Sequence, residues 1–129
     1  MSRPAGRLDR LPACSLPGGL FLREARSVLS RMRGLAGLDD LPDRTALLIP
    51  RCRSVHTFGM RFPIDVIFLD GDRRVVRVDP DVPPRRVVWA RGARAVVETR
   101  AGEATRFIRS WSASEDAGRA VDVAPSTTR

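Results

Sequence analysis

The stretch that most constrains the fold is the apolar run Ile64–Leu69, which is followed directly by Asp-Gly-Asp at positions 70–72. Successive side chains of a strand point to opposite faces, so Ile64, Val66 and Phe68 share one face of this run. Both faces are then largely apolar, which is typical of a strand covered on two sides. The Asp-Gly pair predicts a tight hairpin, because Gly adopts positive φ without steric strain. Val75–Val78 would form the returning strand.

Asp65 is the exception in this run, since it places a carboxylate among apolar side chains. An unpaired charge costs several kcal/mol when it is buried. We therefore expect Asp65 to be neutralised, paired with an arginine, or bound by backbone N–H groups. Pro63 cannot donate a ladder hydrogen bond and marks the start of the strand.

The rest of the chain predicts several short elements around this hairpin. Ser27 is a suitable N-cap for a helix over Val28–Arg33, and a longer helix starting at Phe21 is the alternative. Three prolines predict a loop over Asp79–Pro84. Gly102–Ile108 fits either a helical turn or a last strand. Further strands are expected at Leu20–Leu22 (an edge strand), Ala46–Ile49, Val55–Phe58, Val87–Trp89 and Ala95–Thr99.

These elements predict an α+β, mainly β fold. It would be a small antiparallel sheet or partly open barrel of about 6–7 short strands with one or two short helices. A chain of 129 residues is expected to form one domain with its own core. Residues 1–18 would be a flexible arm, 19–110 the globular domain, and 111–129 a frayed tail.

The chain carries a formal net charge of +8, from 23 basic and 15 acidic side chains, and none of the basic residues is lysine. The charge is spread along the chain without a dense basic run interleaved with aromatics, which favours a solvated basic surface over a nucleic-acid site. No segment has the roughly 18 apolar residues of a membrane span, and no export signal precedes Cys14. We therefore expect a cytoplasmic protein.

Three separated blocks of sequence resemble one known family. The blocks are Arg33–Leu35, Phe62–Asp70 and Val96–Glu98 with Ala101–Gly102, and over roughly residues 20–108 they are similar to the domain-of-unknown-function 192 family (uncharacterised protein family 0127), known from bacteria and archaea. The resemblance implies a compact β-rich domain without an established activity. The form His56–Met60 preceding the central block resembles a branch in which some members are encoded beside envelope pilus-assembly components.

Four side chains are candidates for chemistry: Asp65, Glu98, His56 and Cys52. If Asp65 and Glu98 converged, they could act as an acid/base pair, with Arg33 as a counter-ion. Cys52 and His56 reach three zinc ligands only if Asp65 is added, and nothing in the spacing requires it. A cysteine nucleophile with a histidine base would also need an activated thiolate. No phosphate loop, dinucleotide fingerprint or nucleophile elbow is present. We predict no metal and no cofactor.

The function favoured by the sequence is a non-enzymatic module that binds a small ligand or a protein partner near His56, Asp65, Glu98 and Arg33. A hydrolase-like enzyme using Asp65 and Glu98, with or without Cys52 and His56, is the alternative. Nucleic-acid binding is a weaker alternative, which predicts an affinity that falls steeply with salt.

Overall fold

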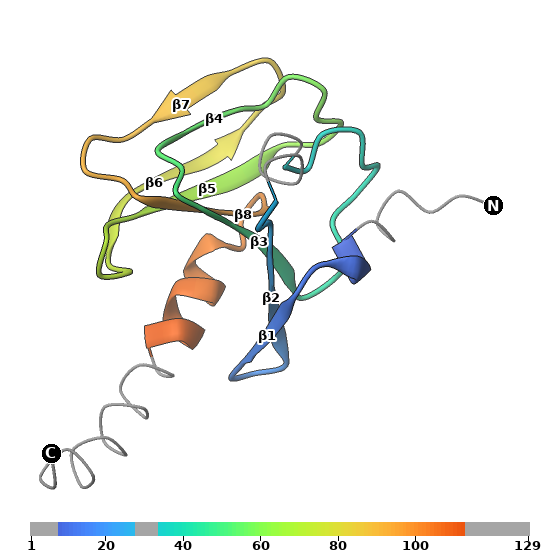
Figure 1. Ribbon diagram of the computed structural model, residues 1–129. Coiled ribbons are helices and arrows are strands. Elements are labelled where there is room, and N and C mark those ends of the chain that lie inside the picture. The colour runs from blue at the N-terminus through green and yellow to red at the C-terminus, as the bar shows by residue number, and fades with distance from the viewer. Residues whose placement is uncertain (1–7, 28–33, 113–129) are drawn as a thin grey trace, which may run out of the picture.

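The computed structural model describes residues 8–27 and 34–112, and these form a mainly β fold of the α+β class (Figure 1). A helix occupies residues 104–112 of the described chain. The strands are β1 (Ala13–Leu16), β2 (Leu20–Glu24), β3 (Thr45–Pro50), β4 (Ser54–His56), β5 (Ile64–Leu69), β6 (Val75–Val82), β7 (Val87–Trp89) and β8 (Ala95–Arg100).

Six of these strands form one open sheet in the order β1-β2-β3-β8-β5-β6, and β4 and β7 form a separate two-stranded sheet. All neighbouring strands are antiparallel except β2 and β3, which are parallel. The predicted class is therefore confirmed, as an open mixed sheet and not a closed barrel. The small sheet and the helix lie on opposite sides of the large sheet (Figure 1).

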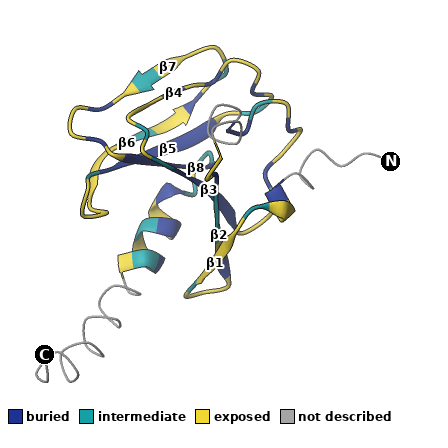
Figure 2. Cartoon of the chain, in the orientation of Figure 1, coloured by how far each residue is buried: buried dark blue, intermediate teal, exposed yellow. Residues whose placement is uncertain are grey.

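Strand β5 is buried along its whole length, as its apolar pattern predicts (Figure 2). Its two faces belong to two different apolar clusters. We call the cluster under the small sheet the loop-side core; it includes Leu35, Leu47, Val55, Ile64, Val66 and Phe68. We call the cluster under the helix the helix-side core; it includes Leu20, Leu48, Ile67, Leu69, Val97 and Phe107.

The hairpin between β5 and β6 is confirmed, although its turn differs from the expected one. The positive φ of 66° falls on Arg73 and not on Gly71. Asp70 closes the turn, because its Oδ1 accepts hydrogen bonds from the backbone N–H groups of Asp72 (2.8 Å) and Arg74 (2.9 Å). The bond from Arg74 is the main reason that the pKa of Asp70 lies below its ordinary value. The aspartate at the start of the turn therefore fixes this hairpin.

The loop predicted over Asp79–Pro84 is wrong, because β6 continues to Val82. Proline is tolerated there because β6 is the last strand of the sheet, so Pro80 need not donate to a neighbour. The register with β5 shifts between Ile64 and Val66, which places Pro80 and Asp81 opposite Asp65 as a β-bulge. Asp81 has a φ of 51°, as the strained residue of that bulge.

The N-terminal segment also departs from the prediction. Part of the expected arm is folded: β1 pairs with β2, and Leu8 is fully buried in the loop-side core. Since β1 flanks β2, β2 is an inner strand and not the predicted edge. The alternative helix starting at Phe21 is wrong, because Phe21 belongs to β2.

The remaining elements follow the prediction closely. Strands β3, β7 and β8 occupy the expected positions, β4 covers the first part of Val55–Phe58, and β5 starts directly after Pro63. The residues after Gly102 form a helix, which was one of the two alternatives, and Trp111 packs on the helix-side core. The predicted helix over Val28–Arg33 and the tail beyond residue 112 lie outside the described residues.

Candidate functional site

The carboxylate of Asp65 is buried and is held by three backbone N–H groups. Its Oδ1 accepts from Asp81 of the β6 bulge at 2.8 Å, and its Oδ2 accepts from Gly102 and Ala104 at 3.0 Å each. Ala104 begins the helix, where unpaired N–H groups favour a negative charge. Of the three environments expected for Asp65, backbone N–H groups are the one observed. Asp65 thus joins a strand, a bulge and a helix end.

Glu98 is the second buried carboxylate, with a side chain in the loop-side half of the molecule opposite Leu47 and Val66. Its Oε1 has no hydrogen-bond partner within the described chain. A hydrogen bond from the Leu35 backbone favours the charged form, but burial dominates and raises the pKa of Glu98 from 4.5 to about 8. Glu98 is therefore a largely neutral acid at pH 7.

The structure does not bring Asp65 and Glu98 together. Asp65 is opposite Thr99 in the β5–β8 pair, whereas Glu98 is opposite Val66. Adjacent residues of a strand project to opposite faces, so the two carboxyl groups lie on opposite sides of the sheet. They do not form the acid/base pair that the sequence left open. Arg33, the expected counter-ion, lies outside the described residues.

Cys52 and His56 occupy different surroundings. Cys52 is half-buried before β4, and its thiol donates to the carbonyl oxygen of Ser54 at 3.0 Å. His56 is exposed on β4, where its ring lies 5.9 Å from that of Phe58 between centroids. Among the residues that the structure describes, no three His, Cys, Asp or Glu side chains are grouped as a metal site requires.

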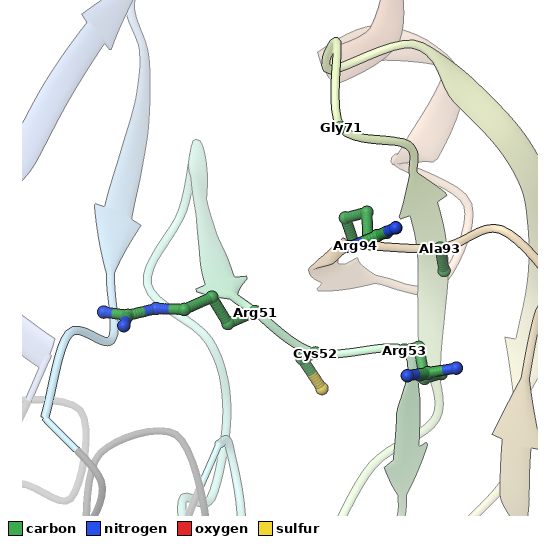
Figure 3. Close-up of a pocket in the computed structure, with 6 residues that line it drawn as sticks. All are labelled: Arg51, Cys52, Arg53, Gly71, Ala93 and Arg94. Atoms are coloured by element: carbon green, nitrogen blue, oxygen red, sulfur yellow. The ribbon is translucent and has the colours of Figure 1, made fainter.

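A basic pocket of about 340 Å³ lies beside Cys52 (Figure 3). Three arginines line it: Arg51, Arg53 and Arg94. The guanidinium group of Arg51 points away from those of Arg53 and Arg94 in Figure 3. The three cations therefore do not converge on a common point, as a tight anion site would require.

Among the described residues, the most exposed large apolar side chains are on the small sheet. In the register of β4 with β7, Ser54 is opposite Trp89 and His56 is opposite Val87. These four side chains are exposed, whereas Val55 and Val88, between them, face the loop-side core. We call Ser54, His56, Val87 and Trp89, together with the neighbouring Phe58, the outer face of the small sheet. Val87 and Trp89 are each 62% exposed and Phe58 is 51% exposed.

Of the predicted site residues that the structure describes, His56 is therefore the one that lies on this exposed surface. Asp65 and Glu98 are inside the domain on either side of the large sheet. Trp89 was assigned only to a strand by the sequence. Alternation within Val87–Trp89 would have indicated that two of its side chains share a face, but not that this face is uncovered.

Thr57 is a structural residue that the sequence did not single out. It is fully buried at the end of β4. Its hydroxyl donates to the carbonyl oxygen of Pro83 at 2.7 Å and accepts from the N–H of Arg86 at 2.8 Å. Thr57 thus ties the small sheet to the loop that leads from β6 to β7, and it holds β7 in place.

We expect Thr57→Val to lower the free energy of unfolding by about 2 kcal/mol, because it removes both hydroxyl bonds and leaves two backbone groups unpaired. Thr57→Ser keeps the hydroxyl and should lose less than about 1 kcal/mol. Urea unfolding of both variants tests this expectation. Equal stability of the two variants would show that the hydroxyl does not hold the loop.

Comparisons with known proteins identify one uncharacterised family and two similar solved structures. The family model DUF192, described as "Uncharacterized ACR", matches residues 20–108. A crystal structure of a protein of unknown function from Novosphingobium aromaticivorans is similar, with a TM-score of 0.60, 22% identity, and coverage of 77% of this chain and 88% of that one. A Sinorhizobium meliloti protein described as "a putative transcription regulator" gives a TM-score of 0.60 and 19% identity, covering 74% of this chain and 82% of that one.

These identities are low, so the two structures establish a shared fold only. A comparison with curated proteins found no match. Within the described chain, none of the helical structure is long and apolar enough to cross a membrane.

Proposed function

The chain belongs to the DUF192 family, and we propose that it is a non-enzymatic binding module that docks a protein partner on the outer face of the small sheet. The observation that carries the proposal is the exposure of Val87, Trp89 and Phe58 on one surface. Exposed tryptophan is enriched at the centre of protein interfaces, because it buries a large apolar area when the partner docks. By family resemblance, an envelope pilus-assembly component is the first partner to test.

The positions of the two buried carboxylates argue against the hydrolase-like alternative. A two-carboxylate mechanism needs both groups at one substrate, and Asp65 and Glu98 lie on opposite faces of the sheet. Asp65 is already bound to three N–H groups of the fold. His56 is available for contact with a partner through its place on the outer face.

Replacing Trp89 should weaken binding of the partner without destabilising the fold. Trp89→Ala should change the free energy of unfolding by no more than about 0.5 kcal/mol, since the side chain is mostly exposed. Phe21→Ala is the matched control, because Phe21 is an aromatic residue of the large sheet that is 42% exposed. We expect Trp89→Ala to lower the affinity for the partner at least tenfold, and Phe21→Ala to leave that affinity unchanged.

The partner can be found by placing a photo-crosslinking amino acid at position 89 or at position 21 of the full chain in its native host. A discrete crosslinked protein is expected at position 89 only. Purified, it should bind the chain with the dependence on Trp89 given above. Equal crosslinking at both positions, no crosslinking at position 89, or an affinity that ignores Trp89→Ala would overturn the proposal. Binding of duplex DNA with a steep salt dependence, in place of protein, would also overturn it.

A further inference from the structure

A groove of about 320 Å³ runs along one edge of β7. Its wall on the β6 side is formed by Arg77 and Asp79, and the β7 side carries Arg91 at its end; the other lining residues are Val87, Val88 and Trp89. Inward-facing Val88 and outward-facing Val87 and Trp89 both line it, whereas no β4 residue does. The groove therefore follows the edge of β7 that points away from β4.

On that edge, the backbone of β7 has hydrogen-bonding groups that no strand of the described chain uses. Ala90 donates to Arg53 at 3.3 Å and Thr57 donates to Arg86 at 2.8 Å, which identifies Arg53–Ala90 and Thr57–Arg86 as hydrogen-bonded pairs. Such pairs alternate along an antiparallel ladder, so the N–H and C=O groups of Val87 and Trp89 point away from β4. In the described chain β7 pairs with β4 alone.

The groove also carries a cation that is not neutralised. Arg77 is paired with Asp79 at 2.7 Å, so these two charges balance each other. Arg91 makes no ion pair with any described residue, and the chain as a whole has a formal charge of +8. Charge complementarity therefore favours an acidic occupant over a basic one.

We infer that the partner presents an extended acidic segment, which adds as a third strand to the small sheet along the free edge of β7. Its backbone bonds to Val87 and Trp89, an apolar side chain packs beside Trp89, and a carboxylate pairs with Arg91. This is strand addition, in which backbone bonds provide affinity and alternate side chains provide specificity. The inference rests on the proposed function and adds the chemistry of the partner.

Strand β7 is a better acceptor than β6, the other edge strand beside the groove. Pro80 removes one N–H from β6, and the bulge at Asp81 bends the strand out of register. The edge of β7 is short and regular. It therefore suits a segment of about five residues, in which two alternate residues bond to the strand.

The test uses the purified full chain and a library of displayed random peptides. Selected peptides are expected to alternate β-branched or aromatic residues with Asp or Glu. Binding of a synthetic copy should slow amide hydrogen exchange at Val87 and Trp89 at least tenfold. Methylating alternate backbone nitrogens of that synthetic peptide should lower its affinity at least tenfold, because a methylated nitrogen has no N–H to donate to a strand edge.

Charge is tested by Arg91→Glu, with Arg51→Glu as a control of the same net charge outside the groove. Arg91→Glu should lower the affinity for the selected peptide at least tenfold, and Arg51→Glu should lower it less than twofold. Selection of basic peptides, protection at other amides, or full affinity of the methylated copy would overturn the inference. Consider a partner that crosslinks at position 89 with an affinity that Arg91→Glu does not change and without competition from the peptide. In that case the inference fails while the proposed function stands. Absence of both partner and peptide defeats both.

Discussion

Replacing Glu98 by Gln should stabilise the protein by about 4 kcal/mol at pH 8 and by only about 1 kcal/mol at pH 5. Burial raises the pKa of Glu98 from 4.5 to about 8, so the folded chain binds a proton that the unfolded chain has released over this range. Wild-type stability from this group is complete below pH 4.5 and is lost as the pH rises through 8. Glutamine stays neutral and does not lose it.

Urea unfolding of both proteins at several pH values measures the difference directly. Glutamine also keeps an oxygen that can accept from Leu35, and its N–H₂ takes the place of the O–H of the neutral acid, so the comparison isolates ionisation. Glu24→Gln removes a partly exposed carboxylate paired with Arg26 and should change stability by no more than about 0.5 kcal/mol. A Glu98→Gln difference that is the same at pH 5 and pH 8 would contradict the buried neutral acid.

Replacing Asp65 by Ala should lower the free energy of unfolding by about 4 kcal/mol. Three backbone N–H groups would lose their acceptor. An N–H group left unpaired costs about 1–3 kcal/mol when it is buried, as that of Ala104 is, and the bonds from Asp81 and Gly102 are part-buried. The loss should also loosen the start of the helix. Relative to the wild type, we therefore expect amide exchange to increase more at Gly102 and Ala104 than at the centre of β5, and the unfolding midpoint to fall.

Asp65→Asn separates the loss of charge from the loss of the acceptor. Its amide oxygen can still accept from Gly102 and Ala104, but its N–H₂ group would face the N–H of Asp81, so a loss of about 2 kcal/mol is expected. Asp72→Ala, in the exposed hairpin turn, should cost less than about 0.5 kcal/mol. Unchanged unfolding of Asp65→Ala would show that the carboxylate does not join the strand to the helix.

Local pattern was sufficient to predict the elements that depend on neighbouring residues. The apolar run Ile64–Leu69 predicted a doubly covered strand, and Asp70 with Gly71 predicted the hairpin after it. The extension of β6 through Pro80 was missed because it depends on the place of that strand in the sheet, which local sequence does not specify. The pairing of β1 with β2 was missed for the same reason.

The blocks that carry the family resemblance contact one another in the folded chain. Gly34 adjoins Glu98: a Cβ at position 34 would lie 3.1 Å from Oε1 of Glu98, and the φ of Gly34 is 50°. Gly102 donates to Oδ2 of Asp65 at 3.0 Å. Because these contacts join residues far apart in sequence, spacing alone could not predict them. These blocks therefore join distant parts of the fold.

The candidate surface could be predicted only in part. His56 was selected for its chemistry, and its exposure depends on how β4 packs. Trp89 was not selected, because an aromatic residue in a strand is more often core than surface. The separation of Asp65 from Glu98 follows from the one-residue difference in their register with the neighbouring strand, which becomes visible only once that register is known.

The two ends of the large sheet affect how the protein behaves at high concentration. At one end β1 has only four residues and is bounded by Pro12 and Pro17, and at the other β6 is interrupted by Pro80. Edge strands that are bounded or interrupted by proline are poor templates for edge-to-edge pairing with the sheet of another molecule. Copies of this chain should therefore resist fibril growth through the large sheet, and Pro80→Val should increase fibril formation, as followed by thioflavin fluorescence.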